Sequence, residues 1–386
     1  MARERYDWDE ATQGLLLSAF YYGYVITHLP GGILAEKFGG KWTVGLRTVG
    51  NICSDSIHSS SSCLGWSSWT FGLIRVLEGM GEGPVIPAFI LLLARWVPPS
   101  ERSRFGAMIF GGAQVGNIIG PYLSDIILAD YGDWALVFYV FGGLGIIWII
   151  FWAPLCYSTP NAHPFISDEE KQYLNSNVAA SGLHKKLDPV PFKAILRSAP
   201  LWVLVMAGIG QDWGYFMMII DLPKYFSDVL KIKIKDTSLM SALWYISMYI
   251  SSFVFAYTCD LCIRKKWHSI TTGRKIYTTV SFSIPAIIII LASYSGCNRT
   301  EALVLFITSM TFMGGSYSSV KINAMDIAPN YAGMCSAFAN GIAAVAGIIA
   351  PYLIGMLTPD QTVGQWRTAI WTVFAVLVGT NLVYLI

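Results

Sequence analysis

Charged residues are scarce in this chain. Asp, Glu, Lys and Arg make up 13% of its 386 residues, while 54% are hydrophobic; a soluble domain usually carries about 25% charged residues. Long polar stretches are equally rare, because residues 158–198 form the only one. Apolar runs of roughly 20 residues, enough to cross a bilayer, recur from end to end. The composition therefore excludes an ordinary soluble protein and predicts an all-α membrane protein in contact with the lipid bilayer.

Several functional motifs are also missing. The net charge of +2 comes from dispersed Lys and Arg residues, so no basic arm is available for nucleic acid. Cys259 and Cys262 form a lone C-x-x-C with no second Cys or His pair to complete a zinc site, and helix packing is their expected role. Neither a G-x-S-x-G elbow nor a phosphate loop occurs. We expect no nucleic-acid partner, no metal, no cofactor and no enzyme activity.

Eleven candidate spans are arranged as five and then six. Their expected starts are near Ala11, Thr43, Phe71, Phe105, Trp134, Leu201, Ser238, Ile276, Ala302, Met334 and Thr368. This arrangement predicts an N-terminal half-bundle over residues 1–157, a central cytoplasmic loop over 158–198 and a C-terminal half-bundle over 199–386. Transporters built from two related halves bind their substrate near the midplane between them.

The distribution of Lys and Arg predicts the orientation. One set of alternate loops holds most of these residues, which are Lys37, Lys41, Arg47, Arg95, Arg102, Arg104, Lys185, Lys186, Arg264, Lys265, Lys266, Arg274 and Lys275. The opposite loops are nearly bare, apart from the lysines within residues 224–235. Because cytoplasmic loops carry the excess of positive residues, the first set is expected on the cytoplasmic side.

The second span is weak. Residues 43–68 include Asn51, Asp55, His58 and a run of serines where apolar residues are needed. A central Asp costs about 2.5 to 3.5 kcal/mol on insertion, whereas each Leu or Ile returns only about 0.3 to 0.6 kcal/mol. This span should not insert alone. Either neighbouring helices hold it in place, or this stretch does not belong to the working protein.

The third span contains three ionisable residues. Arg75, Glu78 and Glu82 stand in an otherwise apolar run, and ionisable residues inside a membrane are functional candidates. At 100° per residue they share one stripe of the helix and can form one network. Glu82 is roughly 16 Å into the span, near the bilayer midplane.

The chemistry of this stripe suits proton-coupled binding of an anion. Two carboxylates one turn apart repel each other in a low dielectric, so at least one is expected to bind a proton. Arg75 stays charged and can hold either the glutamates or an anionic substrate. The alternative is a static ion network that fixes helix packing. Gly79, Gly81 and Gly83 favour function, because they let other helices approach this segment.

Residues 31–42, G-G-I-L-A-E-K-F-G-G-K-W, are expected to form a cytoplasmic loop. It is not a phosphate loop, since Trp42 follows the lysine where Ser or Thr is needed. The segment resembles the signature loop of the major facilitator superfamily, which in that family helps to gate the cytoplasmic side. The resemblance implies gating roles for Gly32, Glu36, Lys37, Gly39 and Lys41.

Four segments resemble the anion/cation symporters of this superfamily, the group of sialin, the vesicular glutamate transporters and the type I sodium/phosphate cotransporters. They are residues 8–42, 75–88, 110–125 and 323–358. The resemblance implies the major facilitator fold with twelve spans, of which this sequence lacks the first and seems shortened in the last. It also implies that Arg75 binds substrate and that Glu78 and Glu82 couple protons.

The function implied by the resemblance is symport of small organic anions or phosphate by alternating access, coupled to protons or sodium. We expect a monomer in the plasma membrane or a lysosomal or vesicular membrane. Gln211 stands where the glutamate-carrying branch has an arginine, which disfavours glutamate. The alternative is a non-transporting protein that keeps the fold.

Other polar residues on the spans are secondary candidates. Tyr22, Gln114, Asn117 and Asn340 are assigned to substrate binding, with hydrogen bonding between helices as the alternative. Asp212 lies either in the cavity or at the membrane surface. A lone histidine near a helix end is more often packed than catalytic, so His28 is not placed in the site.

Overall fold

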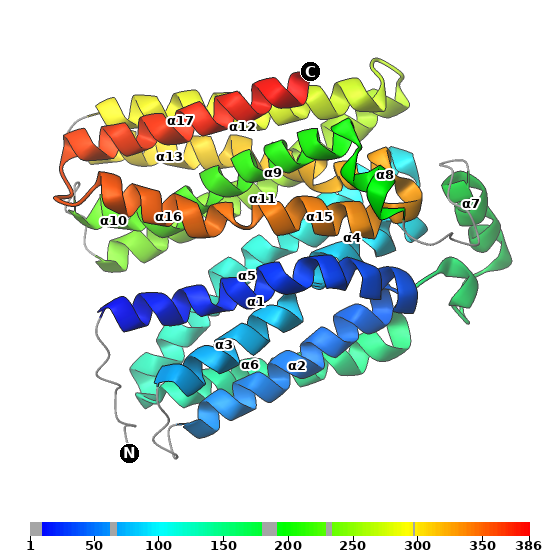
Figure 1. The fold of residues 1–386 in the computed structure, drawn as a ribbon, viewed down its shortest axis with the longest axis horizontal. Coiled ribbons are helices and arrows are strands. Elements are labelled where there is room, and N and C mark those ends of the chain that lie inside the picture. The colour runs from blue at the N-terminus through cyan, green and yellow to red at the C-terminus, as the bar shows by residue number, and fades with distance from the viewer. Residues whose placement is uncertain (1–9, 62–67, 180–190, 229–233, 296–297) are drawn as a thin grey trace. The chain divides into compact units, whose positions relative to one another are not determined.

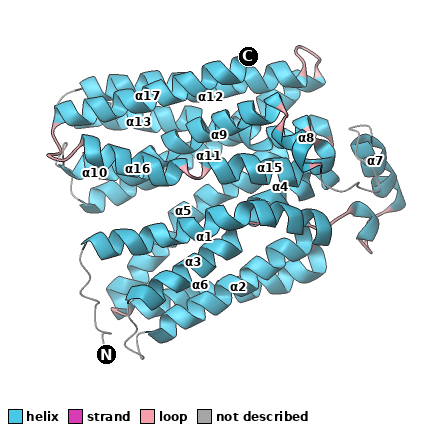
Figure 2. Ribbon diagram, in the orientation of Figure 1, coloured by secondary structure: helices cyan, strands magenta, loops and turns pink. Residues whose placement is uncertain are grey.

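The computed structural model describes residues 10–61, 68–179, 191–228, 234–295 and 298–386, and within these ranges it consists of helices and loops without β-strands (Figure 2). The α-helices are α1 (Glu10–Phe38), α2 (Gly40–Ser61), α3 (Ser68–Glu82), α4 (Val85–Trp96), α5 (Arg102–Tyr131), α6 (Trp134–Leu155), α7 (Asp168–Ala179), α8 (Phe192–Leu196), α9 (Ala199–Phe216), α10 (Leu222–Asp228), α11 (Ile234–Arg264), α12 (Ile270–Tyr294), α13 (Arg299–Met313), α14 (Asn323–Ile327), α15 (Ala332–Ala343), α16 (Ala346–Leu357) and α17 (Val363–Leu385).

Each predicted span coincides with one of the long helical stretches. Within the described residues, eight stretches are long and apolar enough to cross a membrane: Trp69–Trp96, Trp134–Leu155, Ala199–Asp221, Ala242–Arg264, Ile270–Tyr294, Arg299–Ile327, Pro329–Leu357 and Val363–Leu385. α1, α2 and α5 have comparable lengths of 29, 22 and 30 residues but carry more polar side chains. α17 has 23 residues, or about 34 Å of helix. This length is sufficient to cross a membrane.

The predicted loop over residues 31–42 is mostly helical. α1 continues to Phe38, and the break falls at Gly39, whose φ of +87° is a conformation that favours glycine. α2 then begins at Gly40. Arg47, which was expected in the same loop, lies in the second turn of α2. The segment that its charged residues predicted to be a loop is thus two helices with a one-residue break at Gly39.

The chain folds into two compact units. Unit 1 comprises Met1–Val97, Ile119–Val190 and Ala328–Gly341, and unit 2 comprises Pro98–Ile118, Pro191–Ile327 and Ile342–Ile386. Each unit is drawn mainly from one half of the sequence but includes a short segment from the other half. These units are defined by contacts, so the division of the sequence at 157 and 198 stays a prediction.

In unit 1, α1 lies along α3, and α2 packs against α6 and α3 (Figure 1). The crossing of α1 and α3 is lined by glycines. A methyl group at Gly79 would collide with the backbone of Phe20, and one at Gly83 would lie 2.7 Å from the Tyr24 carbonyl oxygen. Because only glycine permits this approach, the two helices meet through their backbones, as the glycine pattern of the third span predicts.

In unit 2, α12 packs against α13 and α17, and α9 packs against α17 (Figure 1). Two of its spans depart from α-helical geometry. α9 passes into a π-helical turn at Met217–Asp221. After α13, the chain forms 3₁₀ turns at Gly314–Ser318 and Val320–Ile322 before α14 begins. Such interruptions expose backbone groups within a span and are frequent at functional sites.

Candidate functional site

The ionisable stripe of the third span lies in unit 1. Arg75 Nη1 is 3.2 Å from Glu78 Oε2, so these residues form an ion pair one turn apart on α3. The Glu78 side chain is 9% exposed, and the Arg75 side chain is 32% exposed. The guanidinium also lies 5.8 Å from the centre of the Phe71 ring. The carboxylate is thus held inside the unit while its partner remains partly accessible.

Glu82 finds its partners on α2. Its Oε1 atom accepts hydrogen bonds from Arg47 Nε at 2.9 Å and Asn51 Nδ2 at 2.7 Å, and Arg47 Nη2 also contacts it. The expected single network of Arg75, Glu78 and Glu82 is therefore divided into two ion pairs. α3 presents both acids, and the second cation comes from the neighbouring helix.

Sequence reasoning missed Arg47 and Asn51. They are four residues apart and share one face of α2. Their pairing with Glu82 supports the first of the two readings of this polar span, in which neighbours hold it in place. The side chains of Asp55 and His58 lie outside the described residues.

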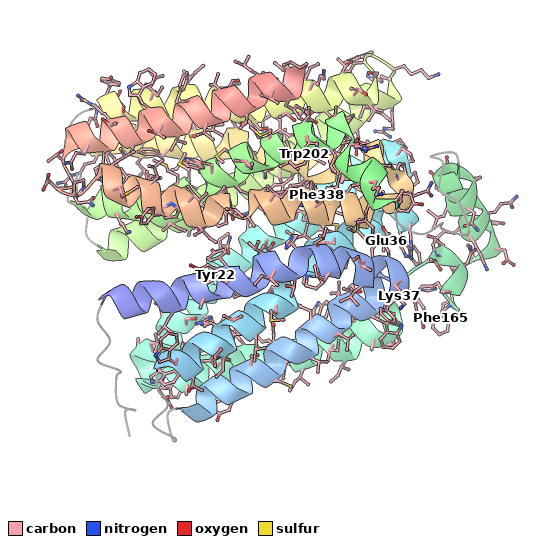
Figure 3. All side chains as sticks on the ribbon, viewed as in Figure 1. Tyr22, Glu36, Lys37, Phe165, Trp202 and Phe338 are labelled. Atoms are coloured by element: carbon pink, nitrogen blue, oxygen red, sulfur yellow. The ribbon has the colours of Figure 1, made fainter. Side chains whose placement is uncertain are left out.

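The gating residues lie where the end of α1 meets α15, both within unit 1 (Figure 3). A methyl group at Gly32 would come within 2.6 Å of the Ala337 side chain, so glycine permits this contact. Glu36 lies beside the first turn of α15, and Arg95 Nη2 is 3.8 Å from its Oε2 atom. Burial raises the pKa of Glu36 to about 7, although Arg95 and the amides of Met334 and Gly333 oppose this rise.

Lys37 and Lys41 occupy the junction of α1 and α2. The ammonium of Lys41 is 4.1 Å from the centre of the Tyr157 ring, and its backbone N–H donates to Ser158 Oγ at 3.3 Å. Lys37 is exposed and lies over the Phe38 ring. Lys41 therefore ties the junction to the chain after α6, whereas Lys37 remains at the surface.

Three other polar residues considered in the sequence analysis, Tyr22, His28 and Asn340, also belong to unit 1 but lie on α1 and α15. Tyr22 is on α1 and is 50% exposed (Figure 3). Asn340 Nδ2 donates to the carbonyl and the hydroxyl of Ser336, both at 3.0 Å within α15. His28 is fully buried, with its ring 4.5 Å from that of Tyr24. The structure thus gives His28 the packing environment expected from the sequence.

Gln114 and Asn117 belong to a polar cluster in unit 2. Gln114 Nε2 donates to the Tyr317 hydroxyl at 2.6 Å and to the Tyr215 hydroxyl at 3.1 Å. Asn117 Nδ2 donates to the same Tyr215 hydroxyl at 3.2 Å. The structure therefore brings these two candidates together through Tyr215 and Tyr317, which were not among the predicted site residues. The signal was a phenol within a predicted span, which needs a polar partner when buried.

Asp212 forms an ion pair with a residue that the sequence analysis missed. Lys321 Nζ is 3.0 Å from Asp212 Oδ1, and the two side chains are 13% and 15% exposed. Of the two alternatives for Asp212, this burial favours a position inside the unit over one at the membrane surface. The missed signal was a lysine in the middle of an apolar stretch.

Two arginines that were expected in cytoplasmic loops are buried in unit 2. Arg102 and Arg274 are each 1% exposed and share the carboxylate of Asp326, at 3.2 and 2.8 Å. Arg274 Nη1 also donates to Ser103 Oγ at 2.7 Å and to the Ser318 carbonyl at 2.6 Å. Arg274 thus holds the turn region of Ser318, while Arg102 donates to the Met325 carbonyl and Asp326. Both arginines lie near the starts of α5 and α12, so the assignment to loops was wrong for these two residues.

The fold and its buried ion pairs together define a polytopic membrane transporter. The chain belongs to the Major Facilitator Superfamily, whose family pattern matches residues 1–351. The expected family, the all-α membrane fold and the multi-pass membrane location are confirmed. No ligand site follows from this membership alone, so the site residues stay predictions.

Relatives and solved structures agree with that assignment. A putative inorganic phosphate cotransporter of Drosophila melanogaster is 37% identical over 366 residues, covering 93% of this chain and 69% of the relative. Human sialin is 36% identical over 375 residues, covering 97% and 74%. The proton:xylose symporter XylE has a TM-score of 0.74 at 14% identity, covering 97% of this chain and 86% of that one, which shows the shared fold.

Proposed function

We propose that the chain is a proton-coupled symporter of small organic anions or phosphate that works as a monomer by alternating access and needs no cofactor. The observation that carries this proposal is the matched pair of ion pairs in unit 1. Arg75 faces Glu78 and Arg47 faces Glu82, so two cations balance two acids. The names of the relatives, a phosphate cotransporter and sialin, support an anion as the substrate.

The charge balance sets the proposed sequence of events. With both acids ionised, the four residues have no net charge, and so they attract an anionic substrate only weakly. Uptake of one proton by Glu82 leaves a net charge of +1, and Asn51 and Arg47 lose an ionic partner. The net positive charge then attracts the substrate anion. Arg75 stays paired with Glu78 through Nη1, and its partly exposed guanidinium offers its other N–H donors to the carboxylate or phosphate of the substrate.

The test is uptake into proteoliposomes that contain the purified chain. Phosphate, sialic acid, glutamate and urate serve as labelled probes, under imposed proton or sodium gradients. We expect proton-driven uptake of at least one probe and weak uptake of glutamate. Glu82→Gln should abolish the response to the proton gradient. Glu101→Gln, which removes an ion-paired acid outside the stripe, should leave uptake unchanged.

Other outcomes would replace the proposal. Full gradient-driven uptake by Glu82→Gln would remove the coupling role of this residue. Uptake driven by a sodium gradient alone would mean that the coupling ion is sodium and not the proton. Failure of the folded wild-type chain to take up any probe would favour the second candidate from the sequence, a non-transporting protein that keeps the fold.

A further inference from the structure

The ion pair of Asp212 and Lys321 lies at two interrupted spans of unit 2. Asp212 is on α9, five residues before the π-helical turn Met217–Asp221. Lys321 is within the 3₁₀ turn Val320–Ile322, which follows Ser319 with its non-helical φ of −127° and ψ of −88°. Interrupted spans are where transporters place ligand sites, since their backbone groups are not all used within the helix.

The two elements that carry this ion pair also carry polar side chains. Tyr215 is three residues after Asp212 and so shares its face of α9. Its hydroxyl accepts hydrogen bonds from Gln114 and Asn117. Tyr317 is on the same interrupted stretch as Lys321, and its hydroxyl accepts a hydrogen bond from Gln114 at 2.6 Å. The elements that carry the ion pair thus also carry the two tyrosines of a hydrogen-bonded polar group within unit 2.

A buried ion pair joins two helices at a high cost in desolvation free energy. Each charge loses its hydration on burial, and apolar side chains of similar volume often stabilise a protein as well or better. Asp212 and Lys321 each have a side-chain exposure of about one seventh, so both have lost most of their water. Their retention inside an apolar bundle is understandable if one of the charges is used by a ligand.

We propose that Lys321 is a second anion-binding residue of this carrier and that Asp212 is the counter-ion which the substrate displaces. The ammonium exchanges one carboxylate for the carboxylate or phosphate of the substrate, so its charge is never unpaired. Tyr215, Gln114 and their neighbours then offer hydrogen bonds to the polar body of the bound anion. This inference rests on the proposed function, because it assigns a further residue to the same transport cycle.

The two variants have opposite expected effects on binding. Lys321→Gln removes the anion's partner and should raise KM about tenfold, as the loss of one charge-assisted hydrogen bond does. Asp212→Asn removes the competitor and should lower KM severalfold. If the pair only joins helices, a different pattern is expected. Both variants should then lower the yield of folded protein, and neither should selectively change KM.

The experiment measures KM and kcat for inorganic phosphate and sialic acid in proteoliposomes that contain wild type, Lys321→Gln, Lys321→Arg, Asp212→Asn or the double variant. Lys321→Arg should keep KM within about threefold, and Asp212→Asn should have no further effect once Lys321 is Gln. The control is Lys275→Gln, because Lys275 is half-buried and its ammonium donates to the Leu385 carbonyl near the end of α17, away from this ion pair in sequence. Its KM should equal that of wild type.

The outcomes separate this inference from the proposed function. If wild type transports a probe and KM is unchanged in both Lys321→Gln and Asp212→Asn, the inference is overturned while symport stands. If wild type transports no probe, the proposed symport function is wrong, and the role of Lys321, which rests on it, falls with it. Should Lys321→Gln not fold, Asp212→Asn and Lys321→Arg still decide the matter, since a raised KM in Asp212→Asn contradicts the displaced counter-ion.

Discussion

At the scale of single residues, the division of the acidic stripe is the main finding. Arg47 reaches Glu82 from α2, and Asn51 donates to the same oxygen atom. Glu78 keeps Arg75 as its own partner. Each acid of α3 therefore has a separate cation, and the two pairs can open independently of each other.

Substitution of Arg47 should disturb coupling more than substrate binding. In Arg47→Gln, Glu82 loses the cation that pairs with its carboxylate once the coupled proton has left. Slower proton release should reduce the maximal rate of proton-driven uptake about tenfold or more, while KM for the anion changes little. Uptake rates measured over a range of internal pH values check this expectation.

A conservative variant provides the control. Arg47→Lys keeps the positive charge and should retain most of the rate. An equal loss in Arg47→Lys and Arg47→Gln would mean that the shape of the guanidinium, and not its charge, is what Glu82 requires.

The sequence predicted part of this site for a physical reason. Arg75, Glu78 and Glu82 stand out because an ionisable residue is unusual in an apolar run. Arg47 stands in a polar span, where one more charge is not distinctive, and Lys321 was overlooked although it lies within the apolar stretch Arg299–Ile327. Which acid pairs with which cation depends on how α2 and α3 cross, and that crossing is not encoded in the spacing of either helix.

At the scale of elements, the end of α1 is the most informative. Its contact with α15 places the carboxylate of Glu36 beside the amides of a helix N-terminus, where a negative charge is favoured. Burial nevertheless dominates and raises the pKa of Glu36 to about 7. The small and charged residues drew attention to this segment, but they predicted neither the continuation of the helix to Phe38 nor the contact with α15, which lies about 300 residues further along the chain.

Stability should therefore depend on pH through Glu36. The folded chain keeps the proton up to about pH 7, whereas the unfolded chain loses it near 4.5. Folded protein binds more protons in this interval, so the free energy of unfolding falls as pH rises from about 4.5 to 7 and then levels off. The loss should approach about 3 kcal/mol, at 1.36 kcal/mol for each pKa unit.

Thermal unfolding in detergent at pH 5 and pH 8 measures this effect. Glu36→Gln cannot titrate, so its unfolding temperature should fall less than that of wild type between the two pH values. Glu170→Gln on α7 is the matched control, because Glu170 is exposed. The interpretation is wrong if wild type and Glu36→Gln show the same change with pH.

At the scale of the whole molecule, the sequence established the class but not the composition of the two units. Hydropathy is a property of each helix alone, and so each of the eleven predicted spans lies on a helix of the described residues, where eight stretches are apolar enough to cross a membrane. Membership of Ala328–Gly341 in unit 1 and of Pro98–Ile118 in unit 2 depends on contacts between distant segments. Sequence periodicity carries no information on such contacts.

This exchange of segments predicts how a divided chain behaves. If the chain is split between residues 185 and 186, each half lacks a segment of its own unit. We expect the two halves to co-purify when they are expressed together and to be degraded when they are expressed apart. Affinity purification through a tag on one half, followed by limited proteolysis, measures this. Stable, protease-resistant single halves would contradict it.

The matched charges inside the units also determine how the membrane voltage acts on the carrier. Arg47 with Glu82, Arg75 with Glu78, and Lys321 with Asp212 each sum to zero. An electric field does work of about 2.3 kcal/mol per elementary charge for each 100 mV, and it does none on a neutral pair that moves as a unit. These three pairs therefore contribute no electrical work when the empty carrier reorients, and at these positions only the charge of the bound anion and proton responds to the voltage.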